Sequence, residues 1–546
     1  MRITIAYNAF AKLHLTACKA IGLMCQSMGI ITMNKTTMAV LAGLLAAPAL
    51  ATSPATAETL QVAVGTSDIT NLDPHRANGF DSMLLSNVFD GLVRFPPGSA
   101  DPAKLEPDLA ERWETAADGK SWTFHLRKGV KFQGGFGEVS ADDVVFSLKR
   151  AADPKTSSFA GNFAVIADVV KVDEMTVRIE LKYPDAGLLG LLSNFNGGRI
   201  VSKKAAEQMG AGFSAKPIGT GPFAIAEHVP QQYVRLTANK DSFRGAPKID
   251  EVFWRFVLSD SSRDLAFQSG QIDMIYGRRE QRWVTQVKAR PDAVVDIFGL
   301  GEFRTLHINR SIKPLDDIRV RQAIAAAIDV DQIVRFVGPD VARKGCSVVP
   351  PGYRGEDCSW TVKTDVNRAK ALLKEAGHPD GITLTVVVSN ISSQLPIMEV
   401  IQNQLGKAGI KLDMKVVDHP TYQQQIRQNA SALVFYGAAR FPVADSYLTE
   451  FYHSAATVGK PTAITNFSHC AIADAEIEQA RKETDAARQM AAWKVAQEKI
   501  NSDVCAVPLF ELQQVWARSR KVDYGYELKG AINIAPQITE KTTVTR

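Results

Sequence analysis

Acidic side chains are absent from the first 57 residues of this 546-residue chain, whose charged residues there are Arg2, Lys12, Lys19 and Lys35. A stretch with positive charges and no negative ones is typical of a targeting segment. Within it, a positive start at Met33 precedes an apolar stretch over 38–50 and an A-x-A site that ends at Ala57. The sequence therefore predicts a secretory signal that starts at Met33 and is cleaved after Ala57.

Residues 1–32 are then either an over-extended start or an extension of the signal. The alternative, that residues 1–57 contain a buried helix of the mature fold, leaves the A-x-A site and the missing acids unexplained. We expect a periplasmic protein.

No run of about 20 apolar residues occurs, so we expect no permanent membrane span. Without the four basic residues of the first 57 positions, the formal net charge falls from +5 to +1. Such a nearly neutral chain offers no electrostatic case for nucleic acid as a partner.

Cysteine is scarce, and four cysteines follow the signal: Cys346, Cys358, Cys470 and Cys505. No C-x-x-C or Cys/His spacing suggests a metal site, so we predict neither metal nor cofactor. His419, His453 and His469 are scattered without ligand-like spacing, and we interpret each as structural or solvent-exposed. An even count in an oxidising compartment favours disulfides. Because Cys346 and Cys358 bracket a Pro/Gly-rich loop, we predict that pair and, with it, Cys470–Cys505, although other pairings stay open.

The motifs of common hydrolases, G-x-S-x-G, S-x-x-K and H-E-x-x-H, are also missing. Gly119, Lys120 and Ser121 are similar to the end of a phosphate loop, but Glu114 stands where its first glycine is required. The sequence therefore favours a binding protein over an enzyme. A periplasmic peptide-handling enzyme or a chaperone with the same fold remains the alternative.

Strand-like alternation is present at 59–65, 122–126 and 169–181, with helices expected near 81–90 and 142–150. Farther along, a helix over 365–377 has an N-cap at Asp365 and a stop at Gly377. A β-branched run (382–388), a helix (397–407) and a second run (410–417) follow. This order predicts a parallel crossover unit in an α/β lobe.

Several blocks resemble the family 5 extracellular solute-binding proteins of bacteria, which serve ABC importers. They are EPDLAERW (106–113), DGKSWTFHLRKGVKF (118–132), SADDVVFSLKR (140–150), PIGTGPF (217–223), SGQID (269–273) and PLDDIRVRQAIAAAID (314–329). We interpret most of them as scaffold. Asp316 or Asp317 is expected to cap a helix with Arg319 and Arg321 facing outward, and Gly219 and Gly221 are expected to need unusual backbone angles.

The resemblance implies an α/β, two-lobed periplasmic-binding-protein fold of the cluster C type, with an inserted α+β module in the first lobe. Mapped onto this chain, it implies a split lobe I (58–100, 216–312 and 505–546), an inserted module (101–215) and lobe II (313–504). It also implies a monomer that closes by a hinge around a small-molecule or peptide ligand and delivers it to permease subunits served by a separate ATPase.

The ligand site is expected at a lobe II stretch, LVFYGAARFPVADSY (433–447). Peptide-binding relatives have an aspartate there that pairs with the ligand's α-amino group, but this chain has Arg440. A guanidinium attracts a carboxylate or phosphate. We therefore hypothesise an anionic ligand at Arg440 with Phe441 and Tyr436 as aromatic wall, while an Arg440 that faces outward or pairs with Asp445 is equally open.

Further candidates lie on the opposite face and near the expected hinge strand. Asn78 and Phe80 follow the first strand where relatives contact ligand backbone, although a turn explains them equally well. Phe303 and Arg304 lie just before a predicted hinge strand that ends at Asn309.

Overall fold

The computed structural model describes residues 58–545 except 186, 194–196, 361–362 and 460–464. The predicted signal segment, residues 1–57, lies outside the described residues. None of the helices within the described ranges is both long and apolar enough to cross a bilayer.

A nine-stranded sheet organises the molecule in the order β16-β12-β17-β11-β1-β10-β9-β8, with β13 also paired to β17. Its strands are β1 (Thr59–Val64), β8 (Phe223–Val229), β9 (Tyr233–Ala238), β10 (Glu251–Phe256), β11 (Met274–Tyr276), β12 (Ala293–Ile308), β13 (Ala342–Lys344), β16 (Leu433–Ala438) and β17 (Ala506–Ser519). Strands from distant parts of the sequence are thus neighbours in one sheet.

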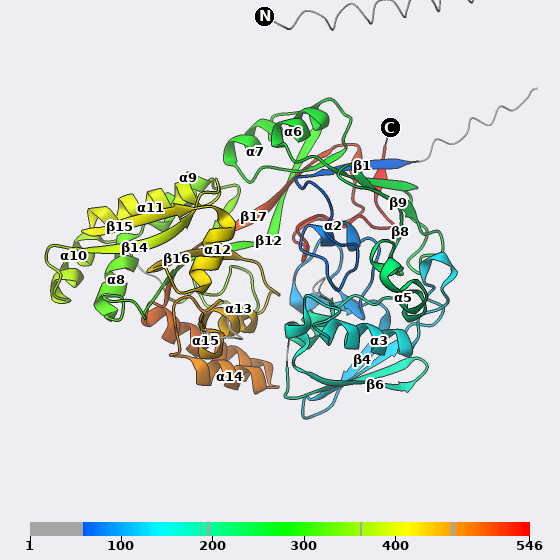
Figure 1. Ribbon diagram of the computed structural model, residues 1–546, viewed down its shortest axis with the longest axis horizontal. Coiled ribbons are helices and arrows are strands. Elements are labelled where there is room, and N and C mark those ends of the chain that lie inside the picture. Colours follow the sequence, from blue (N-terminus) through cyan, green and yellow to red (C-terminus); the bar gives the residue numbers. More distant parts are fainter. Residues whose placement is uncertain (1–57, 186, 194–196, 361–362, 460–464, 546) are drawn as a thin grey trace, which may run out of the picture. The chain divides into compact units, whose positions relative to one another are not determined.

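The two long strands β12 and β17 run between the two halves of the described chain (Figure 1). They pair antiparallel from Ala293 opposite Ser519 to His307 opposite Ala506, with a register shift between Phe298 and Glu302. At one end of this pair β17 also pairs with β11, and at the other end β12 also pairs with β16. They therefore connect the part that contains β1 to the part that contains β16.

Residues 101–215 form a separate four-stranded sheet in the order β4-β5-β7-β6. Its strands are β4 (Ala110–Thr115), β5 (Ser121–Leu126), β6 (Ile166–Asp173) and β7 (Thr176–Leu181), and its helices are α3 (Ala141–Ala152), α4 (Leu188–Ser193) and α5 (Lys203–Met209). Ser140 and Asp143 form a capping box that starts α3.

The predicted crossover unit is present: β14 (Ile382–Ser389) pairs parallel to β15 (Ile410–Val417) along its whole length. Helix α11 (Leu395–Lys407) connects these strands. The preceding helix, α10 (Val366–Glu375), is capped by the Asp365 side chain, which accepts from the Arg368 amide, and Gly377 has φ +89°.

The remaining helices of residues 313–504 are α8 (Ile318–Ala327), α9 (Val330–Val337), α12 (His419–Arg427), α13 (Ala444–Tyr452), α14 (Asp474–Lys482) and α15 (Ala486–Ser502). Elsewhere lie α2 (Asp81–Leu85), α6 (Asp260–Gln268), α7 (Gln281–Lys288) and the short strands β2 (Val93–Arg94), β3 (Glu106–Pro107), β18 (Val522–Asp523) and β19 (Thr543–Val544). The helix expected over 81–90 is therefore only five residues long. The short 3₁₀ helices are η1 (Pro102–Lys104), η2 (Gln133–Gly135), η3 (Ala160–Phe163), η4 (Gly210–Ser214) and η5 (Ser454–Ala456).

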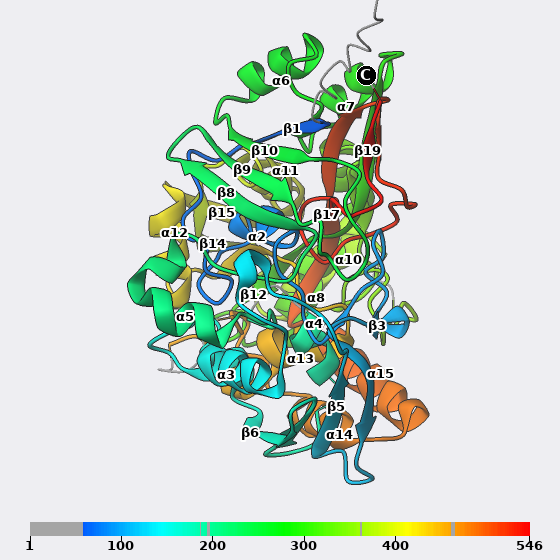
Figure 2. The same cartoon turned by 90° about the vertical axis from the view of Figure 1, so that its right-hand side faces the viewer.

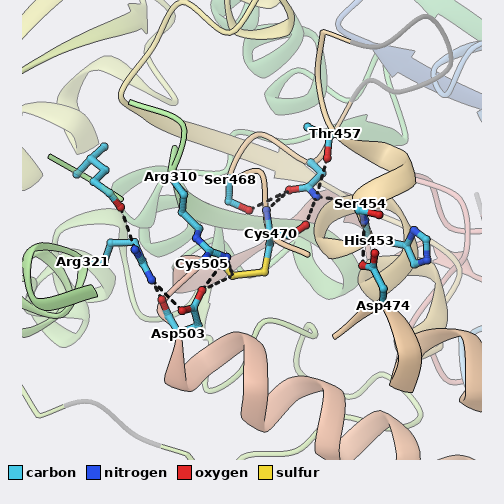
Figure 3. Close-up of a disulfide and its surroundings, with 12 residues drawn as sticks. Arg310, Arg321, His453, Ser454, Thr457, Ser468, Cys470, Asp474, Asp503 and Cys505 are labelled. Atoms are coloured by element: carbon cyan, nitrogen blue, oxygen red, sulfur yellow. Dashed lines mark hydrogen bonds and ion pairs between the residues drawn. A yellow bond between two sulfur atoms is a disulfide. The ribbon is translucent and has the colours of Figure 1, made fainter. Parts of the chain in front are cut away.

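Helix α8 begins at the Asp317 cap, as expected, but the prediction that Arg321 faces outward is wrong. Arg321 is 1% exposed, and its guanidinium lies 2.8 Å from the carboxylate of Asp503. Arg310, just after β12, binds the same carboxylate at 2.8 Å (Figure 3). A buried charge is stable only when paired, so Asp503 anchors α8 and the ends of both long strands.

Both cysteine pairs are bonded in the structure: Cys346 to Cys358 and Cys470 to Cys505. The second disulfide lies beside Asp503 and reinforces the same anchor (Figure 3). Cys505 immediately precedes β17, so the crosslink holds the start of this strand.

Gly219 and Gly221 are needed for space and not for unusual backbone angles, which corrects the expectation. A Cβ on Gly219 would lie 2.1 Å from the Val88 carbonyl oxygen, and one on Gly221 would lie 2.7 Å from the Asn87 carbonyl oxygen. Neither glycine has a positive φ. The close backbone approach explains why both lack side chains.

Candidate ligand-binding site

Strand β12 presents Glu302 and Arg304 on one face and Phe303 on the other, because successive side chains of a strand alternate. Phe303 is 1% exposed, and its ring lies 6.0 Å from that of Tyr447 in the hydrophobic core. Phe303, a predicted ligand contact, therefore lies in the core instead.

Glu302 holds two guanidinium groups. Its carboxylate lies 2.5 Å from Arg304 and 2.7 Å from Arg279, which follows β11. Burial raises the pKa of Glu302, but the charges of Arg304 and Arg279 outweigh it and lower the pKa to about 2. Glu302 therefore stays ionised at every physiological pH and fixes both arginines.

Arg304 lies across strand β16 at a glycine. It pairs in register with Gly437, where a Cβ would come within 2.6 Å of the Arg304 side chain. The guanidinium carbon also lies 5.9 Å from the ring centre of Phe435. Gly437 thus provides the flat surface on which Arg304 lies.

A third guanidinium, that of Arg427 at the end of α12, has only neutral hydrogen-bond partners. It donates to the Gln423 side chain at 2.5 Å and lies 3.5 Å from the hydroxyl of Tyr436. Among the described residues no carboxylate lies within 4.0 Å of Arg427. Of the guanidiniums of Arg279, Arg304 and Arg427, that of Arg427 is therefore the most available to bind an anion.

His419 connects Arg427 electrostatically to the β12 pair. Burial lowers the pKa of His419, and the charges of Arg304 and Arg427 lower it further while Glu302 opposes them. His419 is therefore neutral near pH 7. We call Arg279, Glu302, Arg304 and Arg427 the arginine cluster; it combines three positive charges with one negative charge.

Phe80, which directly precedes α2, is 41% exposed, and its ring meets that of Tyr276 edge-on at 6.0 Å. Tyr276 is the last residue of β11. Burial raises the pKa of Tyr276, and the nearby charges of Arg279 and Glu302 lower and raise it, respectively. Asn78 is exposed, but its side-chain oxygen accepts from the Phe80 amide at 2.8 Å. Phe80 therefore lies near the arginine cluster, whereas Asn78 shapes the turn.

Arg440 is paired, but not with Asp445. Its Nε lies 2.5 Å from Glu450, one turn and a half along α13, and its guanidinium carbon lies 5.5 Å from the ring centre of Phe451. With one carboxylate to one guanidinium, this pair has no net charge. Tyr436 lies at the arginine cluster, because its hydroxyl faces Arg427. Phe441 packs against Phe95 instead, with the ring centres 5.8 Å apart.

One group of three potential metal ligands occurs within the described ranges: Cys346, Glu356 and Cys358. Because the two sulfur atoms are bonded to each other, they are not thiolates and the group does not fit a metal ion.

Sequence reasoning missed Arg279, Glu302 and Arg427 and treated His419 as structural. These residues lie just after β11, on β12 and on α12, and α12 is far from the two strands in the chain. No local motif connects them, and only the pairing of β12 with β16 and of β11 with β17 brings them together.

The family model for bacterial extracellular solute-binding proteins, family 5 (middle region), matches residues 104–458. The chain belongs to this family. Its members are substrate-binding proteins that work with ABC permeases, which agrees with the predicted function, and they are not enzymes.

A solved structure of the binding protein MoaA of A. tumefaciens R10, in complex with mannopinic acid, is 47% identical, covers 90% of this chain and 100% of its own, and has a TM-score of 0.78. DppA of Helicobacter pylori in complex with the peptide STSA is 27% identical over 90% of this chain and 99% of its own, with a TM-score of 0.74. Di/tripeptide-binding protein 2 of Pseudomonas aeruginosa is 29% identical and covers 81% of this chain and 87% of its own length. The two-lobed α/β fold expected from the sequence is thus confirmed.

Proposed function

We propose that this protein is the periplasmic substrate-binding component of an ABC importer and that its ligand is a small acidic solute of the mannopinic acid type. The arginine cluster carries the proposal. Two guanidinium groups, those of Arg279 and Arg304, share the Glu302 carboxylate there, and a third, that of Arg427, has only neutral partners. An excess of two positive charges attracts a ligand carboxylate and repels a ligand ammonium group.

The similarity to MoaA supports the same ligand class. That structure contains mannopinic acid, an acid that is anionic at neutral pH, and shares 47% of its sequence with this chain. Peptide-binding relatives are less similar, at 27% and 29%. Arg440 adds to the case, because the family resemblance implies an aspartate there in peptide-binding members, and its replacement removes the partner of a peptide's amino group.

In this proposal Arg427 and Arg304 bind the ligand's carboxylate, Tyr436 contacts it from lobe II, and Phe80 and Tyr276 contact it from lobe I. The lobes close around it by bending at β12 and β17 near the register shift at 299–301. The protein is exported through the predicted signal, acts as a monomer without nucleic acid or a catalytic step, and presents its closed form to the permease.

A ligand screen tests the proposal. The mature chain, starting at Glu58, is melted in the presence of mannopinic acid, glutathione and a series of dipeptides, each at the same concentration. We expect mannopinic acid to raise the melting temperature most, because a ligand that binds only the folded state stabilises it. A shift with dipeptides and none with mannopinic acid would refute the ligand class while leaving the family intact.

Native mass spectrometry of the purified chain then separates binder from enzyme. We expect the added acid to appear bound and unchanged in mass, whereas a product of altered mass would show catalysis.

A further inference from the structure

The inserted module contacts lobe II through residues that are not part of the arginine cluster. The ring of Phe441, in lobe II, lies 5.8 Å from that of Phe95 in lobe I. A Cβ on Gly190 of helix α4 would lie 2.3 Å from the same Phe441 ring. Phe441 therefore fills a notch that exists only because residue 190 has no side chain.

A further contact extends this meeting of the two parts. A Cβ on Gly119, in the turn between β4 and β5, would lie 3.3 Å from the methyl group of Thr484, which precedes α15. Both views place the sheet of the inserted module and helices α14 and α15 at the same end of the molecule, opposite α6 and α7 (Figures 1 and 2). The contact thus lies at the end where hinge motion would be largest.

A small polar cavity is part of this contact. It is lined by Asp185 and Gly187 from the inserted module and by Asp445 and Arg481, among others, from lobe II. Its volume of about 10 Å³ leaves room for no more than about one water molecule. Two carboxyl groups from opposite sides are therefore brought together where little water reaches them.

The two carboxylate oxygens of Asp445 differ in their contacts. Its Oδ2 accepts from Thr449 at 3.3 Å and lies 3.7 Å from Arg481, whereas its Oδ1 is buried and has no partner among the described residues. Asp185 accepts a hydrogen bond from the Gly187 amide, at 2.8 Å. A proton on Asp445 would reduce the repulsion between the two carboxylates.

The cations around Asp445 do not neutralise the two carboxylates of Asp185 and Asp445. Among the described residues, Arg481 of α14 is the cation within 4.0 Å of Asp445, while His453 at the end of α13 lies 3.4 Å from Glu478, and Arg354, which also lines the cavity, is exposed. Burial raises the pKa of Asp445 to about 6, with Arg481 opposing and Asp185 adding to the rise. Burial also raises the pKa of Asp185.

We propose that this contact, formed by Phe95, Asp185, Gly190, Phe441, Asp445 and Arg481 and called the latch, locks lobe II onto the inserted module on closure and takes up a proton as it forms. It rests on the proposed function, since closure is part of that function. When the lobes part, water reaches Asp445 and the separation from Asp185 grows. The closed state then binds the proton more tightly than the open state, so lowering the pH from 7.5 toward 5.5 favours closure.

The test measures closure without any ligand, so that its failure leaves the ligand proposal untouched. Spin labels are attached to cysteines introduced at Glu207 on α5 and Lys370 on α10, both exposed, and the distance between them is measured by pulsed electron paramagnetic resonance at pH 7.5 and 5.5. We expect the ratio of closed to open molecules to rise about fourfold on acidification.

Two isosteric variants serve as matched controls. Asp445→Asn mimics the protonated carboxyl, so we expect it to be as closed at pH 7.5 as the parent is at pH 5.5 and to lose the pH response; Asp185→Asn should weaken that response. Phe441→Ala should reduce the closed population at both pH values and keep the pH response. A distance distribution that ignores pH in the parent, or one that responds equally in Asp445→Asn, overturns the proposal.

Discussion

Arg440 and the arginine cluster differ in the balance between their positive and negative charges. Arg440 faces one carboxylate, that of Glu450, whose side chain is 41% exposed. In the cluster, Glu302, whose side chain is 30% exposed, is shared by two guanidiniums, and the third, that of Arg427, has only neutral partners. The comparison teaches that an arginine is available to an anion only after its carboxylate partners are counted, and sequence position does not give this count.

The largest expected effect is a difference in stability between variants of Glu302 and of Glu450. Glu302→Gln leaves two guanidiniums without their shared partner, so we expect it to lower the free energy of unfolding by about 3 kcal/mol. Glu450→Gln removes a more exposed, single pair and should cost less than about 1 kcal/mol. Urea unfolding of both variants measures the difference, and equal losses would end the distinction between the two sites.

The pH dependence follows from the same carboxylate. The folded-state pKa of Glu302, about 2, is below its ordinary value of 4.5. Its contribution to stability is therefore complete above pH 4.5 and is lost as the pH falls from 4.5 toward 2. We expect Glu302→Gln to flatten the stability curve in this range, while an unchanged slope would show that Glu302 is not held by both arginines.

A smaller effect, on affinity, separates the two kinds of arginine. Arg427→Ala removes a charge-assisted hydrogen bond to the ligand, and we expect about 10-fold to 100-fold weaker binding of mannopinic acid by calorimetry. Arg440→Ala should change the affinity less than about threefold, because its charge is already used. The reverse order would restore Arg440 as the ligand's partner. Arg427→Lys, which keeps the charge without the planar fork, should be intermediate.

The smallest effect concerns the lobe I side. Phe80 offers its exposed ring near the cluster but no charge, so Phe80→Ala should weaken binding about threefold through lost apolar contact. Asn78→Ala is the matched variant, and it should lower stability by about 1 kcal/mol through the lost turn bonds with little change in affinity. Calorimetry and thermal unfolding of both variants measure this, and an affinity loss confined to Asn78→Ala would contradict the assignment.

Much of the scaffold is predictable because its signals are local. The crossover from 382 to 417 combines β-branched runs with an intervening helix, and the helix before it has its own cap and glycine stop; each signal needs only its neighbours in the chain. Arg321 shows the limit. Its helical position favoured solvent, but Asp503, 182 residues away, holds it in the core.

The candidate site was less predictable for the same reason. Tyr436 and Arg304 were expected to contact ligand and do lie at the arginine cluster, but Phe303 faces the core because strand alternation turns it away from Arg304. Arg440 attracted attention as a departure from the family's pattern, and its partner Glu450 lies on a helix face that the sequence did not assign. The cluster itself depends on strand pairing across more than 100 residues.

The most direct test of the account is a crystal structure of the mature chain with mannopinic acid. We predict a carboxylate of the ligand within hydrogen-bonding distance of Arg427, beside Arg304 and Tyr436, with the Arg440–Glu450 pair intact. A ligand whose carboxylate displaces Glu450 from Arg440, with Arg427 left in contact only with Gln423 and Tyr436, would contradict it.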